Sequence, residues 1–150
     1  GQLFEDLGVI SAICAQVDTV AVTDSPFYAY VTRPGSITTL KKQGSKHIQD
    51  MGAAIEAVRQ VAEGDFESEF ECFQAYCTLR VAMRINPDSF SDKAVFRKYL
   101  RHARDLAKHA SRSSLASRTW RMRCALFAFS PKIHNVFYAL YAAASGKAIG

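Results

Sequence analysis

Apolar residues recur at helical spacing along most of the chain, so the pattern predicts a mainly helical protein. A first helix is expected over about residues 7–17, and the remaining helices follow a polar loop at residues 41–46. The expected inward faces of the first four helices are Leu7, Ile10, Cys14 and Val17; then Ile48, Met51, Ile55, Val58 and Ala62; then Phe66, Phe70, Phe73, Cys77 and Val81; and then Val95, Tyr99, Leu106 and Ala110.

Residues that stop or cap helices mark several boundaries. Gly64 is expected to end the second helix, and Ser91 is expected to cap the fourth. A short fifth helix is expected around residues 116–129. Pro131 suits the first position of a last helix that runs to about Ala144, because proline there loses no helical hydrogen bond.

Two short runs near the N-terminus, residues 19–23 and 27–32, are rich in β-branched or aromatic residues and predict strands. The Asp-Ser-Pro sequence between them would form the turn, and Pro34 with Gly35 would turn the chain after the second strand. An isolated hairpin is marginally stable, so this one must pack on the helices. The predicted fold class is therefore mainly α, a helical bundle of five to six helices with a short N-terminal β-hairpin.

Charge is spread unevenly over the 150 residues, although the formal net charge is only +5. Up to Phe90 there are 7 Lys and Arg against 12 Asp and Glu, and from Ser91 onward 12 against 2. A basic surface favours anionic partners, which could be a membrane headgroup layer, a lipid-linked diphosphate or nucleic acid. Nucleic acid is the least favoured, because the basic stretch has few aromatic residues to stack on bases. The residues expected to contact an anionic membrane are Lys93, Arg97, Lys98, Arg101, Arg104 and Lys108.

Cysteine and histidine usage points to no metal centre in this chain. The cysteines lack CxxC spacing and are expected to be buried thiols of a reducing compartment, without zinc or disulfides: Cys14, Cys72, Cys77 and Cys124. The histidines lack ligand-spaced partners and are expected to pack or face solvent: His47, His102, His109 and His134. The longest apolar stretch, residues 139–144, is too short to span a bilayer, and no signal peptide is recognisable. The expected location is the cytoplasm, either free or peripheral to the inner face of the membrane.

Two adjacent carboxylates, Glu5 and Asp6, stand where the first helical pattern begins. Free N–H groups and the helix dipole would keep a carboxylate there ionised and fixed in direction, which suits a general base. The plainer alternative is that Asp6 caps the helix while Glu5 lies in solvent.

Three motifs strengthen the catalytic interpretation. Phe-Glu-Asp-Leu at 4–7, Asp-Ser-Pro-Phe-Tyr-Ala-Tyr at 24–30 and Arg-Pro-Gly-Ser-Ile-Thr at 33–38 together resemble the last third of family-2 glycosyltransferases. These are inverting enzymes of the GT-A type that build bacterial surface polysaccharides. The resemblance implies that residues 1–40 end a GT-A catalytic domain and that residues 41–150 form a C-terminal helical region.

The resemblance also implies roles for particular residues. Asp6 would accept the proton of the acceptor hydroxyl, and Glu5 would orient or bind that hydroxyl. Arg33, with Ser36, would close over the donor diphosphate, with a solvated Arg33 beside a turn as the alternative. Tyr28 and Tyr30 share one strand face that would line an acceptor groove or pack in the core.

The nucleotide-binding strands and the Asp-x-Asp element of such enzymes are not found in this sequence. A divalent metal, Mg or Mn, is expected in the full-length enzyme with ligands outside this chain, and the chain alone is expected to be inactive. The predicted function is therefore the C-terminal portion of an inverting glycosyltransferase with a nucleotide-sugar donor and a saccharide or lipid-linked acceptor. The alternative is a non-catalytic helical interaction module whose basic face docks on a membrane or a protein.

Overall fold

The computed structural model describes residues 3–25, 44–62, 64, 66–85, 88 and 90–144, and this part of the chain is mainly helical. Its helices are α1 (Glu5–Cys14), α2 (Ser45–Ala62), α3 (Glu67–Ala82), α4 (Lys93–Ala110), α5 (Arg118–Phe129) and α6 (Pro131–Ala144). The mainly helical class is confirmed. The last helix begins at Pro131 and ends at Ala144, as its proline signal predicted.

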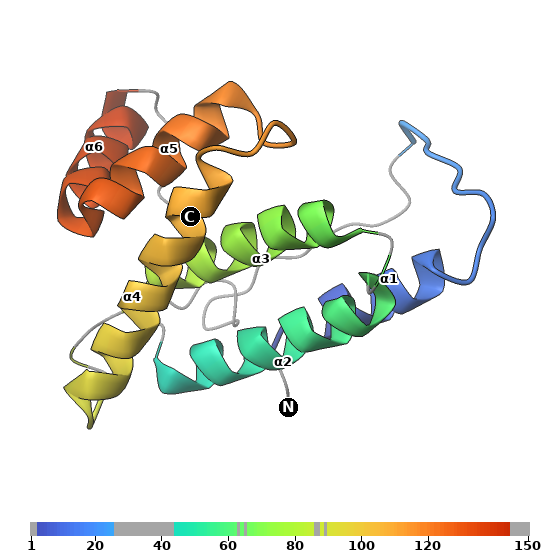
Figure 1. Cartoon of the computed structure of the whole chain (residues 1–150), viewed down its shortest axis with the longest axis horizontal. Helices are drawn as coiled ribbons and strands as arrows, with labels where there is room; N and C mark the ends of the chain where they lie inside the picture. The colour runs from blue at the N-terminus through green and yellow to red at the C-terminus, as the bar shows by residue number, and fades with distance from the viewer. Residues whose placement is uncertain are drawn as a thin grey trace.

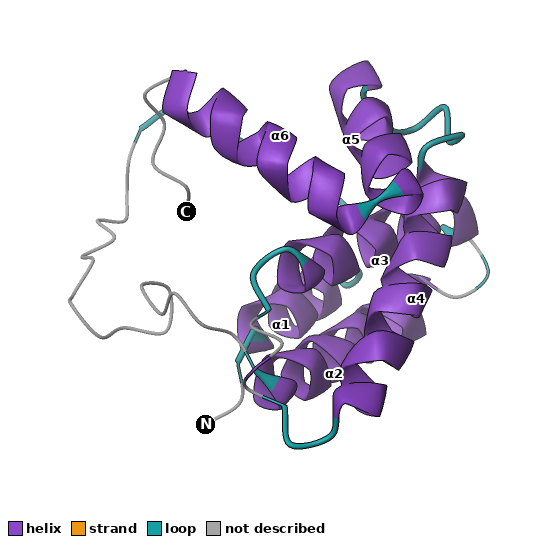
Figure 2. Cartoon of the chain, turned by 90° about the vertical axis from the view of Figure 1, so that its left-hand side faces the viewer, coloured by secondary structure: helices purple, strands orange, loops and turns teal. Residues whose placement is uncertain are grey.

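Each helix packs mainly on the next one along the chain, so the helices form a serial stack from α1 to α6. In Figure 1, α2 and α3 lie side by side, and α4 crosses them near one end. Helices α5 and α6 continue the stack beyond α4 and α3, and Figure 2 shows α6 far from α1 and α2. Of the described helices, α1 to α3 belong to the acidic first half of the sequence and α4 to α6 to the basic second half, so charge changes along the stack.

Helix α3 is the central element because it is buried on two sides. Toward α1 and α2, its Phe70, Cys77 and Val81 join a cluster with Met51 and Ile55, which we call the α1–α3 core. Toward α4 and α5, a second cluster, the α3–α5 core, consists of Ala75, Leu79, Ala82, Ala103, Ala107, Ala110, Cys124 and Phe127. Tyr99 packs against both cores, and its hydroxyl donates a hydrogen bond to the carbonyl oxygen of Thr78 at 3.1 Å.

The predicted faces of α2 and α3 are largely correct. Met51 and Ile55 are buried, as are Phe70, Cys77 and Val81 on α3, and Cys124 and Phe127 on α5. Phe66 is an exception, because it precedes α3 and its side chain is 56% exposed. Helix α2 ends at Ala62, and Gly64 adopts a left-handed backbone with φ of 94°, which favours glycine.

Helix α4 differs from its sequence prediction at both its cap and its face. Asp92, not Ser91, caps it, and its carboxylate accepts a hydrogen bond from the Ala94 N–H at 2.7 Å. Val95 was expected inside but is exposed. The fully buried positions are the small residues Ala103, Ala107 and Ala110, because close packing against α3 and α5 leaves little room for larger side chains.

The predicted inward face of the first helix is wrong beyond Leu7. Ile10 is 58% exposed, and Cys14 and Val17 are also exposed. Helix α1 instead approaches α2 closely at Gly8, where an added Cβ would lie 3.1 Å from Ala57 Cβ. No residue of α1 is buried, and the helix turns its small side to α2 because that side permits this close approach.

The first strand of the predicted hairpin is also wrong, because residues 19–23 follow irregular backbone and their valines are exposed. Among the described residues no strand pairs with this run, and an isolated strand is not stable by itself. The second predicted strand, residues 27–32, lies outside the described residues.

The cysteines are buried only in part. Cys77 and Cys124 are buried, and burial raises the pKa of these thiols to about 11 and about 12. Cys14 was predicted to be buried but is exposed, because it lies on the solvent side of α1. None of the helices that the structure describes is both long and apolar enough to cross a membrane.

Candidate functional site

The two carboxylates predicted as catalytic lie in the first turn of α1, and both are exposed. Asp6 does not cap the helix: among the described residues, its Oδ1 accepts a hydrogen bond from the adjacent Leu7 N–H at 3.1 Å and from no later turn residue. The residue at the capping position is Phe4, which has a left-handed backbone with φ of 64°. A phenylalanine in this conformation is strained, so neighbouring contacts must hold it.

Contacts with the start of α2 fix the backbone before these carboxylates. Buried Leu3 donates its N–H to Asp50 Oδ2 at 2.8 Å, and the same oxygen lies 2.6 Å from Lys46 Nζ. The Phe4 ring meets the ring of His47 edge-on, with centroids 6.4 Å apart. This anchoring leaves the side chains of Glu5 and Asp6 facing solvent from a fixed backbone.

The roles of Asp50 and His47 in holding the backbone before α1 were not predicted. The hydrogen bond from Lys46 and then that from the Leu3 N–H lower the pKa of the Asp50 carboxyl. Burial lowers the pKa of the His47 imidazole, whose Nδ1 accepts a hydrogen bond from the Gly44 N–H at 3.3 Å. The Lys46–Asp50 spacing of four residues is the sequence signal that could have found the ion pair.

The other predicted site residues, Tyr28, Tyr30, Arg33 and Ser36, lie outside the described residues. Of the predicted site residues, the structure therefore describes Glu5 and Asp6, which are adjacent in the sequence. In the described part of the chain, no three His, Cys, Asp or Glu side chains gather in a way that could hold a metal ion.

The basic residues predicted on α4 are all exposed. Five of them fall within an arc of about 80° at 100° per residue, and we call this set the α4 basic stripe. Its members are Lys93, Arg97, Arg101, Arg104 and Lys108. Lys98 lies outside the arc, on a neighbouring part of the helix surface.

One member of the stripe also has a structural role. The Arg104 guanidinium donates hydrogen bonds from Nε and Nη2 to the carbonyl oxygen of Ala128, both at 3.0 Å, and from Nη2 to that of Phe129 at 3.3 Å. These carbonyls belong to the last turn of α5, where a cation suits the negative end of the helix dipole. The Phe129 ring beside it is 75% exposed, so an apolar side chain borders the stripe.

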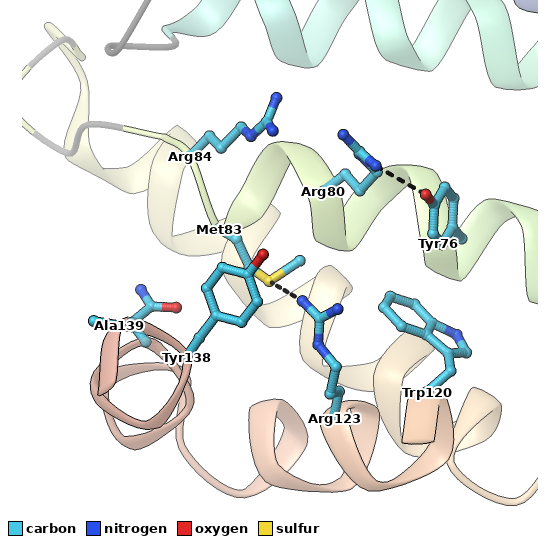
Figure 3. Close-up of a pocket in the computed structure, with 9 residues that line it drawn as sticks. Tyr76, Arg80, Met83, Arg84, Trp120, Arg123, Tyr138 and Ala139 are labelled. Atoms are coloured by element: carbon cyan, nitrogen blue, oxygen red, sulfur yellow. Dashed lines mark hydrogen bonds between the residues drawn. The ribbon is translucent and has the colours of Figure 1, made fainter. Parts of the chain in front are cut away.

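A separate hollow of about 270 Å³ lies between α3, α5 and α6 (Figure 3). It has three arginines and three aromatic residues and, among the described residues that line it, no carboxylate. Arg80 and Arg84 border it from α3 and the turn that follows, and Arg123 borders it from α5. The other lining residues are Tyr76, Met83, Trp120, Asn135, Tyr138 and Ala139.

Aromatic rings hold the guanidinium of Arg123 at one wall of this hollow. The guanidinium carbon lies 4.7 Å from the centre of the Tyr138 ring and 5.5 Å from that of Trp120. Its Nη2 donates to the Met83 sulfur at 3.7 Å, and its buried Nε has no partner among the described residues. On the facing wall, Arg80 donates to the Tyr76 hydroxyl at 2.8 Å.

Comparison of the chain with protein-family models, with curated protein sequences and with solved structures finds no match.

Proposed function

We propose that this chain is the C-terminal portion of an inverting family-2 glycosyltransferase, which transfers a sugar from a nucleotide-sugar donor to a saccharide or lipid-linked acceptor. The observation that supports this most directly is the pair of exposed carboxylates at an anchored helix start. They occur within the Phe-Glu-Asp-Leu motif, in the same order relative to the other two motifs as the resemblance requires.

In this proposal Asp6 is the general base. It takes the proton from the acceptor hydroxyl while the hydroxyl oxygen bonds to the anomeric carbon. The bond from that carbon to the nucleotide diphosphate breaks on the opposite face, so a single base is sufficient for inversion. Glu5 would orient the hydroxyl, Tyr28 and Tyr30 would line the acceptor groove, and Arg33 with Ser36 would close over the diphosphate.

The divalent metal that the resemblance implies does not fit the described residues, since they include no ligand set for it. Its ligands would belong to the nucleotide-binding half of the enzyme. Without that half, the chain would not turn over sugar nucleotide by itself.

The test uses the polypeptide that contains the nucleotide-binding half. Asp6→Asn should lower the transfer rate about 10²- to 10⁴-fold while leaving donor binding unchanged, because the amide cannot accept the proton. Asp18→Asn is the matched control, since Asp18 is an exposed carboxylate just beyond the end of α1. Equal rates for Asp6→Asn and the unsubstituted enzyme would refute the assignment.

The α4 basic stripe favours a second candidate, a helical module that docks on the anionic inner face of a membrane. Five exposed cations on one arc could meet a flat anionic surface together. Each basic residue near such a surface contributes about 1 kcal/mol to the binding free energy. The exposed Phe129 beside Arg104 adds an apolar side chain that could enter the headgroup layer. This function needs no base at Asp6.

Co-sedimentation with vesicles separates the two candidates. The chain should bind vesicles that contain phosphatidylserine and not purely phosphatidylcholine vesicles, and binding should fall as salt rises. Combined replacement of Lys93, Arg97 and Arg101 by Gln should abolish binding, whereas Lys132→Gln, which removes a charge from α6, should not. Binding that is absent or insensitive to salt would remove this candidate.

A further inference from the structure

The hollow between α3, α5 and α6 concentrates positive charge without a compensating carboxylate among the described residues that line it. Burial, and then the charge of neighbouring Arg80, lower the pKa of the Arg84 guanidinium. An arginine remains charged under all ordinary conditions, so Arg80, Arg84 and Arg123 repel one another across this space. An anion bound among them would offset that repulsion.

The guanidinium groups also keep hydrogen-bond donors available. Arg123 Nε is buried without a partner in the described part of the chain, and its Nη2 has only a thioether sulfur, which is a weak acceptor. Arg84 makes no side-chain hydrogen bond or ion pair with the described residues. A ligand with several acceptor oxygens could satisfy donors on both walls of the hollow.

The aromatic residues make this a shaped site and not only a charged surface. Trp120 and Tyr138 hold the Arg123 guanidinium in place, and the Tyr76 ring packs on Trp120 with centroids 5.2 Å apart. Fixing a guanidinium before binding reduces the conformational entropy that its ordering would cost. The rings also offer apolar surface for the organic part of a small ligand.

We propose that this hollow binds the phosphoryl group of a small phosphate ester, with Arg80, Arg84 and Arg123 as its ligands. A phosphoryl group carries up to two negative charges and three acceptor oxygens, which suits three guanidinium forks better than a single carboxylate does. A volume of about 270 Å³ admits a small molecule and excludes a folded partner. The site uses none of the residues assigned to sugar transfer and holds for either candidate function.

Trp120 provides a direct readout, because it is the only tryptophan of the chain. Its fluorescence is measured while inorganic phosphate, phenyl phosphate or acetate is added at constant ionic strength. Phosphate and phenyl phosphate should give saturable changes, with phenyl phosphate the tighter of the two, and acetate should give none. Changes that are equal for all three anions, or no saturable change with either phosphate, would overturn the proposal.

Single replacements then test whether each of the three arginines contributes to binding. Arg80→Gln, Arg84→Gln and Arg123→Gln should each weaken phenyl phosphate binding about ten-fold or more, since hydrogen bonds to charged groups are lost. Arg97→Gln is the matched control, because it removes the same charge from the exposed face of α4. Equal weakening by Arg97→Gln would show non-specific charge attraction and would overturn the proposal.

Because Arg123 is half-buried, its replacement could impair folding, which far-UV circular dichroism would reveal. Arg80 is exposed, so Arg80→Gln keeps the test decisive. Unchanged phenyl phosphate binding by folded Arg80→Gln and Arg84→Gln proteins would rule out the site.

Discussion

The two cores on either side of α3 are built from different kinds of side chain. The α1–α3 core shares its volume among several large residues, including Met51, Ile55 and Phe70. The α3–α5 core is made mostly of alanines around Leu79 and the larger ring of Phe127, both of which are fully buried. The α3–α5 core should therefore depend strongly on that one ring and tolerate added volume poorly, whereas the α1–α3 core should be more adaptable.

Removal of the Phe127 ring is expected to have the largest effect on stability. Phe127→Ala should lower the free energy of unfolding by about 3–5 kcal/mol, because it leaves a cavity among small residues that cannot move in to fill it. Urea unfolding followed by circular dichroism measures this. Phe129→Ala, two residues away and exposed, is the control and should change stability by about 0.5 kcal/mol or less.

A larger side chain tests whether the α3–α5 core tolerates added volume. Ala107→Leu should destabilise the protein by about 1–3 kcal/mol or more, because α4 leaves no space at this fully buried position. Met51→Leu in the α1–α3 core conserves volume and should cost less than about 1.5 kcal/mol. A cost of Ala107→Leu no larger than that of Met51→Leu in urea unfolding would mean that the α3–α5 core has room for the added volume.

Helix α4 supplies three of the five alanines of the α3–α5 core, and the cap at its start can be tested. Asp92→Ala should cost about 1 kcal/mol, because the Ala94 N–H loses its acceptor. Ser91→Ala removes the cap that the sequence favoured and should leave thermal unfolding unchanged. A larger loss from Ser91→Ala than from Asp92→Ala would contradict the observed capping.

Two glycines, Gly8 on α1 and Gly52 on α2, test how closely α1 packs on α2. Gly52→Ala should stabilise the protein by about 0.5–1 kcal/mol, because Gly52 lies within α2 and an added Cβ meets no atom within 4 Å. Gly8→Ala should gain less, since its Cβ would press on Ala57 at 3.1 Å. Thermal unfolding of the two variants compares them directly, and a larger gain from Gly8→Ala would argue against the close approach of α1 to α2.

Buried histidines should make stability fall as pH falls. Burial lowers the pKa of His134, which packs on Phe127 and Tyr138, and the charge of Arg123 acts in the same direction, while the hydrogen bond with Asn135 opposes it. The unfolded state then binds a proton more readily, so stability is retained above about pH 6.5 and is lost as pH falls below it. Urea unfolding at pH 7.5 and 5.5 should show a smaller loss for His134→Gln than for the unsubstituted protein. An equal loss would place the pH dependence elsewhere, with His47 as the next residue to replace.

Helices were predicted correctly from the sequence where apolar periodicity agreed with a capping residue or a proline. The start of the last helix followed from Pro131, and the buried faces of α2 and α3 followed largely from their apolar spacing. The face of α1 did not, because Ile10, Cys14 and Val17 form a valid apolar stripe that the fold leaves in solvent. Hydrophobic spacing measures how much apolar surface a face offers and does not register that Gly8 allows another helix to come close.

The candidate sites also differ in whether the sequence alone could reveal them. Glu5, Asp6 and the α4 basic stripe could be named from adjacent or periodic residues, and their exposure agrees with the roles proposed for them. The arginine hollow could not, because Arg80 and Arg84 precede Arg123 by about forty residues and no local pattern relates them. Only the stacking of α3 on α4, α4 on α5 and α5 on α6 brings them to one space.

The sequence by itself determined that this chain is helical, where most of its helices run, and that its acidic and basic halves differ. These properties depend on residues within a few turns of one another, so local spacing encodes them. Tertiary structure alone decided that α3 separates two unlike cores, that the small side of α1 faces inward, and that three arginines surround one hollow. Those outcomes depend on how closely two helix surfaces can approach, which is a property of the pair and not of either segment.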